Sequence, residues 1–299
     1  MSSQLEEGVV VRGYGGFYYV LPASLAGEPV PCRVRGKLKR TAGRLLVGER
    51  VSYEPPEAPG QEGVIEAHLP RRSELERPPI ANVDQLVAVM SAAKPPPDLL
   101  QVDRLLCWAG SRGLSAAVCL NKADLLGEAE ADALLRCYRE AGRPALAVSA
   151  RTGLHLGELA ALLKGRISVL AGRSGSGKTS LTNRLVPGRH GRTGEVSRKL
   201  GQGRQTTRHV ELIVLPEGGL LADTPGFSSV EELPLTPEEV AAQYPEWDDL
   251  AAGCRFRGCL HDQEPGCAVK AAVAEGALSA DRHRRYLMLL KEARERRLW

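Results

Sequence analysis

Residues 172–179 have the residue types and spacing of a phosphate-binding loop. They read Gly-Arg-Ser-Gly-Ser-Gly-Lys-Thr, the G-x-x-x-x-G-K-[ST] pattern, and an apolar run precedes them. Glycines let successive backbone N–H groups turn toward phosphate oxygens, and a following helix adds its dipole. We expect Lys178 to reach the β- and γ-phosphates and the Thr179 hydroxyl to bind Mg²⁺. The other expected nucleotide contacts are Gly172, Arg173, Ser174, Gly175, Ser176, Gly177 and Ser180.

A second motif selects the base. Residues 121–124 read Asn-Lys-Ala-Asp, the N-K-x-D motif of guanine-nucleotide proteins. The Asp124 carboxylate can accept hydrogen bonds from guanine N1–H and the exocyclic amine, whereas adenine lacks this pair of donors. Asn121 can bond the N7 edge and tie its loop to the phosphate loop, and the Lys122 stem can lie along the base. The sequence Ser-Ala-Arg follows later, and Ser149 and Ala150 are expected to support the guanine carbonyl.

Two segments after the phosphate loop are expected to meet the γ-phosphate and Mg²⁺. Residues 223–226 read Asp-Thr-Pro-Gly, in which Asp223 should hold Mg²⁺ through water and the Gly226 N–H should meet the γ-phosphate. The polar, glycine-rich stretch 187–210 lacks apolar periodicity and is predicted to be a mobile functional loop. Either Thr206 or Thr207 in this stretch should bind Mg²⁺ and sense the γ-phosphate, and we favour Thr207.

The group that orients the attacking water is not obvious from the motifs. Phe227 follows D-x-x-G, where Ras-type GTPases have a glutamine that orients water. Because an apolar ring cannot do this, the group must come from Gln205 within the chain or from a partner. The candidate catalytic residues are therefore Lys178, Gln205 and Thr207.

A metal-binding pattern lies near the C-terminal end. Cys254, Cys259, His261 and Cys267 have the spacing C-x4-C-x-H-x5-C. Three thiolates and one imidazole make a closed tetrahedral Zn²⁺ site, so the predicted role of the metal is structural. A final helix over 279–299 carries seven Lys and Arg residues, which suit either RNA contact or a solvated face. Four other cysteines are expected to be small buried hydrophobes: Cys32, Cys107, Cys119 and Cys137.

Alternating strands and helices must position the nucleotide motifs. Apolar runs at 85–90, 116–120, 145–148 and 167–171 predict buried strands, and the last three each lead into a motif. Amphipathic helices are expected between them, the first capped by Asp98. The guanine motif precedes the phosphate loop, the reverse of the order in ordinary small GTPases. The sequence therefore predicts an α/β P-loop GTPase domain that is circularly permuted.

The N-terminal region is rich in short β runs. Five candidates, separated by Gly-rich or Pro-rich turns, fit a small barrel such as the OB-fold, with an SH3-like barrel as the alternative: 8–12, 17–21, 31–35, 50–54 and 63–68. Residues 31–50 carry seven Lys and Arg residues and one Glu. This charge suits either an RNA-contacting face or a solvated strand edge.

We expect a multidomain protein with three domains. They are an OB-fold-like RNA-binding barrel in 1–70, the permuted GTPase domain in 71–232 and a helical zinc-binding module in 233–299. No apolar run is long enough to span a membrane and no signal peptide is apparent, so we expect a cytoplasmic protein without a membrane partner. The seven cysteines would then be in a reducing compartment. We also expect a monomer.

The combination of barrel, permuted GTPase and Cys3His module resembles the family of the ribosome small subunit-dependent GTPase RsgA, also called YjeQ. The resemblance is carried by residues 121–124, 172–179, 203–207 (Gly-Arg-Gln-Thr-Thr), 223–226 and the zinc spacing. It implies GTP hydrolysis, binding of small-subunit rRNA, and action late in maturation of that subunit. If GTP-loaded protein binds the subunit more tightly than GDP-loaded protein, hydrolysis should drive release. Family members often have His where this chain has Gln205, and Gln can also orient water.

Two alternatives remain open from the sequence. The first is a nucleotide-gated rRNA-binding assembly scaffold that hydrolyses little GTP. The second is another permuted ribosome-assembly GTPase, although the sequence offers no support for the accessory domains of such proteins. In every case the expected small-molecule partners are GTP and GDP.

Overall fold

The computed structural model describes residues 5–36, 38, 45–58, 60–76, 78–188, 210–223 and 233–296. The chain forms two compact units. The first unit comprises residues 1–85, 157–170 and 179–227, and the second comprises residues 86–156, 171–178 and 228–299. Among the described helices, none is long and apolar enough to cross a membrane.

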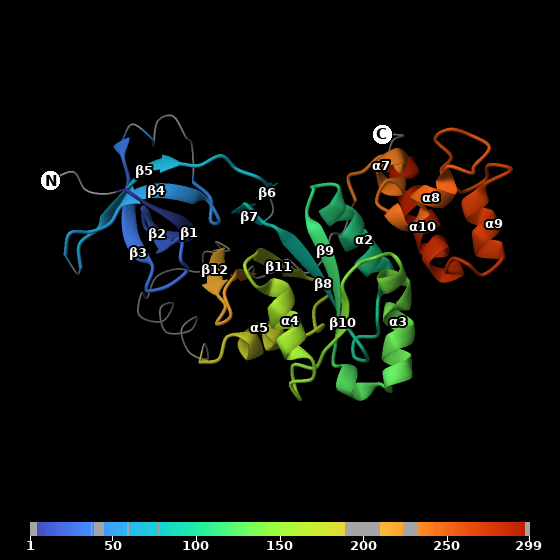
Figure 1. Cartoon of the computed structure of the whole chain (residues 1–299), viewed down its shortest axis with the longest axis horizontal. Coiled ribbons are helices and arrows are strands. Elements are labelled where there is room, and N and C mark those ends of the chain that lie inside the picture. Colours follow the sequence, from blue (N-terminus) through green and yellow to red (C-terminus); the bar gives the residue numbers. More distant parts are fainter. Residues whose placement is uncertain are drawn as a thin grey trace. The chain divides into compact units, whose positions relative to one another are not determined.

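The first unit begins with a closed β-barrel, drawn in blue in Figure 1. Antiparallel pairing joins β1 to β2, β2 to β3, β4 to β5 and β1 to β4, while β3 and β5 are parallel. Because β1 pairs with both β2 and β4, the sheet closes on itself as in the OB-fold, which confirms that prediction. The strands are β1 (Glu6–Tyr14), β2 (Phe17–Pro22), β3 (Val30–Val34), β4 (Arg50–Glu54) and β5 (Gly63–His68).

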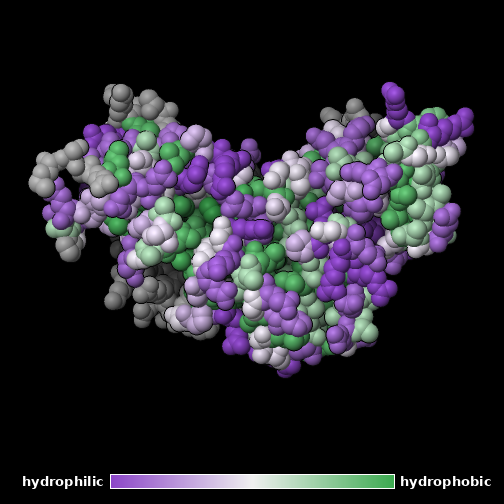
Figure 2. All heavy atoms as spheres, viewed as in Figure 1, coloured by the Kyte–Doolittle hydropathy of each residue, from purple (hydrophilic) through white to green (hydrophobic). Residues whose placement is uncertain are grey.

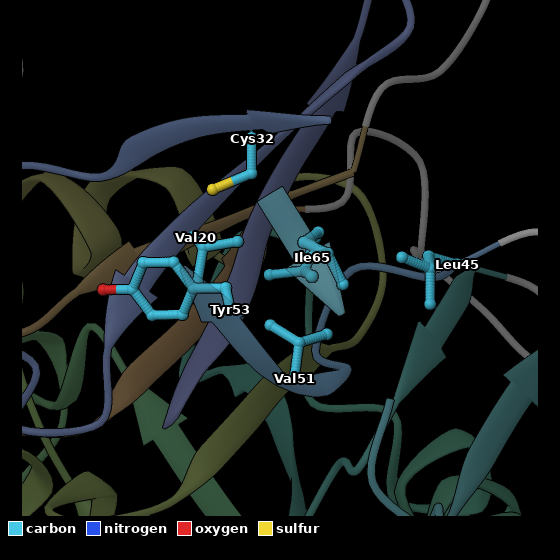
Figure 3. Packing of buried hydrophobic residues seen from close by; sticks show 7 residues of the cluster. Val20, Cys32, Leu45, Val51, Tyr53 and Ile65 are labelled. Atoms are coloured by element: carbon cyan, nitrogen blue, oxygen red, sulfur yellow. The ribbon is translucent and has the colours of Figure 1, made fainter. Parts of the chain in front are cut away.

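Aliphatic side chains, together with the Tyr53 ring and the Cys32 thiol, fill the barrel (Figure 3). Burial raises the pKa of the Cys32 thiol to about 12, so this cysteine stays protonated and packs as the small hydrophobe that was predicted. The Tyr53 ring is buried, and its hydroxyl donates to Glu6 at 3.2 Å. The cluster consists of Val10, Val20, Cys32, Leu45, Val51, Tyr53 and Ile65.

The first unit also contains the strand that leads into the phosphate loop. Its strands continue in the order β11–β13–β12–β1, with β11 parallel to β13 and β12 antiparallel to both β13 and β1. A separate hairpin pairs β6 with β7. These elements are β6 (Glu74–Glu76), β7 (Pro79–Ala81), α4 (Leu156–Leu163), β11 (Ile167–Ala171), α5 (Lys178–Leu185), β12 (Glu211–Val214) and β13 (Leu220–Asp223).

The second unit carries the guanine motif on a buried sheet with strand order β10–β9–β8. All residues of β8 are buried, as expected for a strand covered on both faces. Strands β9 and β10 are parallel, so Asn121 at the end of β9 and Ser149 just after β10 lie at the same edge. The elements are β8 (Gln85–Ser91), α2 (Leu99–Gly110), β9 (Ser115–Asn121), α3 (Glu128–Glu140) and β10 (Ala145–Ala147).

Helix α10 of the second unit packs against α2 through buried ion pairs. Asp103 of α2 is fully buried and accepts from Arg282 at 2.8 Å and from Arg285 at 2.6 Å. Arg282 also donates to Glu246 at 2.5 Å. Removing one partner of such a network leaves an unpaired buried charge, at a cost of about 3–5 kcal/mol. The helices are α7 (Pro237–Ala241), α8 (Asp248–Ala251), α9 (Ala268–Ala274) and α10 (Ala280–Arg296) (Figure 1, orange to red).

Candidate nucleotide site and metal centre

The phosphate loop requires glycine at two positions because other chain segments pass close to it. It follows β11 directly and runs into α5, the predicted strand–loop–helix arrangement. Gly172 has φ +149°, and a Cβ there would overlap the Val89 carbonyl oxygen of β8. Gly177 has φ +94°, and a Cβ there would overlap the Asn121 side-chain amide. Any side chain at these positions would push the loop away from the sheet that supports it.

Lys178 folds back over the loop. Its ammonium donates to the carbonyl oxygens of Gly172 at 2.5 Å and Arg173 at 3.1 Å. Burial lowers the pKa of Lys178, because the charged form loses solvation. The Arg173 guanidinium donates to Asp98 at 3.0 Å, and the other Asp98 oxygen caps α2 by accepting from the Gln101 N–H. The α2 N-terminus is therefore tied to the phosphate loop.

Asn121 joins the guanine motif to both neighbouring loops. It is buried at the end of β9, where its side-chain amide donates to the Ser176 carbonyl at 2.9 Å. Its side-chain oxygen accepts from the Ala150 N–H at 3.1 Å. This single residue holds the phosphate loop, the N-K-x-D turn and the Ser-Ala-Arg loop in one arrangement. The link from Asn121 to the phosphate loop is the contact predicted from the sequence.

Lys122 crosses the phosphate loop. Its backbone has φ +63°, a left-handed conformation that is uncommon for a residue with a side chain. Its ammonium donates to the Gly175 carbonyl at 2.9 Å and also to the Lys94 carbonyl. The extended stem between these contacts and the backbone offers a flat apolar surface of the kind on which a base can lie.

Asp124 presents an ionised carboxylate at the guanine motif. One oxygen accepts from the Ser149 hydroxyl at 2.5 Å, and the other accepts from the Arg151 guanidinium at 2.5 and 3.0 Å. The Ser149 hydrogen bond, followed by the Arg151 contacts, holds the pKa of Asp124 below its usual value. An ionised carboxylate has only acceptors, which is the chemistry that two adjacent N–H donors of guanine require.

Arg151 and Asp98 are two residues that the motifs did not assign a contact. Arg151 is the last residue of Ser-Ala-Arg, a motif position that takes either Lys or Arg. Because both residues are basic, the motif itself is the sequence signal for a cation at this position. Asp98 was predicted only as a helix cap, yet it also binds Arg173 of the phosphate loop. No local pattern predicts that second contact, because 75 residues separate the partners.

The candidate Mg²⁺ ligands are only partly described. Thr179 is exposed in the first turn of α5, and Asp223 is the last residue of β13. Gln205, Thr207 and Gly226 lie outside the described residues, as does Phe227. The exposed segment around Thr179 also contains Ser174, Gly175 and Ser180, whereas the Ser176 side chain is buried.

The four predicted metal ligands come together in the C-terminal module. All ligand atoms of Cys254, Cys259, His261 and Cys267 lie within 4.8 Å of one another, so the cluster could hold a metal ion. The His261 Nδ1 atom is 3.4 Å from the Cys267 sulfur and 3.6 Å from the Cys254 sulfur. The Cys254 and Cys267 sulfurs are 3.8 Å apart. His283 Nε2 lies 2.9 Å from the His261 carbonyl oxygen and supports the loop that carries this ligand.

The basic segment of the barrel is described in part. Arg33 pairs with Glu62 at 2.6 Å, and Arg35 pairs with Glu66 at 2.5 Å. These pairs neutralise two of the charges within the barrel itself, as at a solvated strand edge. Four of the seven basic residues lie outside the described residues: Lys37, Lys39, Arg40 and Arg44.

Comparison with known proteins decides the family. The model of the RsgA GTPase family matches residues 68–232, and the model of the RsgA N-terminal domain matches residues 7–65. The chain belongs to the RsgA GTPase family. It is therefore a GTP hydrolase, and the N-terminal barrel is a regular part of the RsgA architecture.

Relatives match the chain over nearly its whole length. The small ribosomal subunit biogenesis GTPase RsgA of Moorella thermoacetica is 49% identical, covering 97% of this chain and 99% of its own. The protein of the same name from Carboxydothermus hydrogenoformans is 44% identical, covering 96% and 97%.

Solved structures of RsgA-like proteins confirm the predicted fold class. The crystal structure of YloQ, described as a circularly permuted GTPase, has 33% sequence identity and a TM-score of 0.82, covering 98% of this chain and 96% of its own. YjeQ from Thermotoga maritima has 33% identity and a TM-score of 0.81, covering 97% and 99%. The early guanine motif and late phosphate loop thus belong to a circularly permuted GTPase, as the motif order predicted.

Proposed function

We propose that this GTPase binds the small ribosomal subunit and hydrolyses GTP late in maturation of that subunit, with hydrolysis driving its release. One observation carries the proposal: relatives named small ribosomal subunit biogenesis GTPases match 97% and 96% of the chain. The match extends beyond the GTPase domain to the barrel, for which the family has its own model. A barrel and a metal-binding module on a GTPase are suited to binding a large partner.

The geometry of the second unit supports the contacts proposed here for the phosphates and the base. The phosphate-loop backbone and Lys178 bind the phosphates, and Asp124 accepts from the two guanine donors. Lys122 lies against the base, while Asn121, Ser149 and Ala150 hold the base loop. Mg²⁺ is bound with GTP by the oxygen ligands Thr179, Thr207 and Asp223, a donor set that suits this ion. The Gly226 N–H meets the γ-phosphate, and Gln205 orients water.

RNA is the proposed contact of the barrel. Arg12 lies over the Tyr19 ring at 4.0 Å, and Arg33 lies over the Phe17 ring at 5.0 Å. Both rings are half-buried, and the two arginines also pair with Glu211 and Glu62, so an RNA phosphate would have to compete with these carboxylates. Arginine and aromatic side chains together can bind phosphates and stack on bases. The small subunit supplies such RNA, and it also makes the cytoplasm the expected location.

The proposed domains are residues 1–70 for the barrel, 71–232 for the GTPase and 233–299 for the metal-binding module. The proposed oligomeric state is a monomer.

Zinc is the proposed occupant of the Cys3His cluster. A tetrahedral ion with bonds of about 2.3 Å to sulfur and about 2.1 Å to nitrogen separates two sulfurs by about 3.8 Å and a sulfur from a nitrogen by about 3.6 Å. The observed separations of 3.8, 3.6 and 3.4 Å fit these values. Four protein ligands leave no open position, so zinc would stabilise the module and take no part in hydrolysis.

Cys254→Ser should remove the bound zinc and destabilise the C-terminal module. Binding of structural zinc contributes roughly 10–16 kcal/mol in zinc-finger peptides, so losing a thiolate ligand should have a large effect. GTP affinity should be largely unchanged, because the ligands lie outside the nucleotide loops. Metal analysis and thermal unfolding test this, with Cys137→Ser outside the cluster as the matched control. Freshly purified wild-type protein that contains no zinc would refute the assignment.

The proposed function is tested by subunit binding in two nucleotide states. If small subunits favour the GTP-bound form, the coupling must be reciprocal, so GTP-loaded protein should bind subunits more tightly than GDP-loaded protein. Co-sedimentation with purified small subunits, using a non-hydrolysable GTP analogue or GDP, measures the difference. Large ribosomal subunits serve as the control partner. Equal affinity for small subunits in the two states would contradict release by hydrolysis and favour the scaffold.

A further inference from the structure

The metal-binding module exposes an aromatic side chain between two arginines. Phe256 is 44% exposed, although large hydrophobic side chains are mostly buried in the described part of the chain. The Arg255 guanidinium lies over its ring, with Cζ 5.5 Å from the ring centroid. Arg255 and Arg257 are both exposed. Figure 2 shows hydrophobic residues reaching the surface of this module near α9.

The use of phenylalanine in this chain makes the exposure of Phe256 informative. The sequence has three phenylalanines, and the two that the structure describes are Phe17 and Phe256. Neither lies in a core, and each has an arginine over its ring. The aromatic rings that do pack in the core of this module are those of Tyr244, Trp247 and Tyr286. The Phe256 ring is exposed, so core packing does not account for it. Both rings instead belong to surface pairs of an aromatic residue and an arginine.

The segment that carries Phe256 is short and fixed at both ends. Residues 255–258 lie between the ligands Cys254 and Cys259, whose sulfurs belong to one cluster. The Arg255 N–H donates to the Gly266 carbonyl at 3.0 Å. A Cβ on Gly266 would lie 3.1 Å from Arg255 Cβ, so the arginine stem packs closely on this glycine. The ring is therefore presented by a constrained turn, and binding a ligand costs little ordering of the chain.

The charge around Phe256 favours a polyanionic ligand over an apolar surface of a partner protein. The segment between the two ligands, residues 255–258, carries Arg255 and Arg257 and no acidic residue. The nearest acidic residues along the chain are Asp249 and Asp262, and Asp262 pairs with Arg294. An arginine beside an exposed ring can bind a phosphate while the ring stacks on the attached base. Bases in an A-form duplex are already stacked on one another, so a protruding ring can stack only on an unpaired base.

We propose that Phe256 stacks on an unpaired base of single-stranded RNA and that Arg257 pairs with a neighbouring phosphate. The proposal rests on the proposed function, in which the RNA is that of the small subunit. Arg255, stacked over the ring, extends the aromatic platform and adds positive charge. The metal ligands hold this platform in position, which gives the module an RNA-binding role in addition to its structural one.

Binding of short RNA tests the proposal on the full, metal-loaded chain. Anisotropy of a labelled single-stranded oligoadenylate should show Phe256→Ala weakening binding roughly 5- to 150-fold, the range for one lost stacking contact. Phe256→Tyr should bind like wild type. Arg257→Ala should lower the slope of log affinity against log salt by about one, whereas Phe256→Ala should leave the slope unchanged. Met288→Ala, another exposed apolar residue of this unit, is the control.

Crosslinking then locates the contact. Irradiation of the protein with thiouridine-containing single-stranded RNA should attach RNA to the peptide that contains residues 255–257, and Phe256→Ala should remove this product. Wild-type affinity in Phe256→Ala, or crosslinks confined to other segments, would overturn the proposal. Equal weakening of duplex binding by Phe256→Ala would also overturn it.

Binding to purified small subunits separates this inference from the proposed function. If wild type binds subunits in a nucleotide-dependent way and Phe256→Ala binds equally well, stacking is wrong and the proposed function stands. If Phe256→Ala loses subunit binding but keeps oligoadenylate binding, the ring contacts protein, which also overturns the proposal. If wild type shows no nucleotide-dependent subunit binding, the proposed function is wrong, whatever the oligoadenylate result.

Discussion

Asp124→Asn should change the base preference of the nucleotide site from guanine to xanthine. The Asp124 carboxylate is ionised and offers only acceptors, and Ser149 and Arg151 fix its orientation. An amide places a donor where guanine also has a donor, so one guanine N–H loses its partner. Xanthine has a carbonyl in place of the exocyclic amine and can accept from that amide. Sites built to hydrogen-bond a group reject analogues that lack it by ~10⁴–10⁵-fold, and GTP affinity should fall on that scale.

Dissociation constants for GTP, xanthosine triphosphate and ATP measure this change directly. The matched control is Asp132→Asn, which makes the same substitution at an exposed position of α3 paired with Arg139. It should leave all three constants at wild-type values. Equal binding of ATP and GTP by the wild-type protein would remove the basis for assigning base selection to Asp124.

The nucleotide loops could be predicted because their requirements are local. A strand, a glycine-rich turn and a helix follow one another around residues 172–179, and the backbone geometry explains each glycine that the pattern demands. The metal cluster was also predictable, since four ligands within one short segment need little help from the rest of the fold. In both cases the chemistry lies in the spacing along the chain.

The contacts that assemble the site could not be predicted in the same way. Arg173 meets Asp98, and Lys122 meets the carbonyl oxygens of Gly175 and Lys94, through the folding of distant loops against one another. The periodicity of a strand or helix shows which face is buried. It does not show which loop lies opposite a particular side chain.

The last helix illustrates the limit most clearly. Its arginines fit either RNA contact or a solvated face, but for Arg282 and Arg285 both interpretations were wrong. These two side chains are in buried or nearly buried ion pairs with Asp103 of α2. Asp103 lies 179 residues from Arg282 and 182 residues from Arg285 along the chain, so no local pattern could identify it as their partner. Charge patterns alone cannot distinguish a solvated arginine from one that joins two parts of a fold.

Slow GTP turnover by the isolated protein, with strong stimulation by the small ribosomal subunit, is the second large expected effect. Phe227 follows D-x-x-G, where a water-orienting side chain is needed and an apolar ring cannot serve. Gln205 and Thr207 must therefore reach the γ-phosphate from a long polar segment, and fixing that segment costs conformational entropy. A partner that holds the segment closed would remove this cost. An arginine supplied by a partner raises the rate of other GTPases by ~10³–10⁵, and we expect completion of this site to act on a similar scale.

Gln205→Ala separates water orientation from partner binding. If Gln205 orients the attacking water, the variant should lose most of the stimulated turnover while its affinity for small subunits stays close to that of wild type. Gln202→Ala, a neighbouring glutamine of the same segment, is the matched control and should keep stimulated turnover. A normal stimulated rate in Gln205→Ala would assign water orientation to a group supplied by the partner.

GTP turnover by the purified protein, with and without purified small ribosomal subunits at saturating GTP, tests the central claim most directly. We predict a low rate for the protein alone, a rate higher by ~10³–10⁵-fold with small subunits, and no comparable rise with large subunits. Turnover that small subunits leave unchanged would contradict the claim that this GTPase acts on, and is released from, the small subunit.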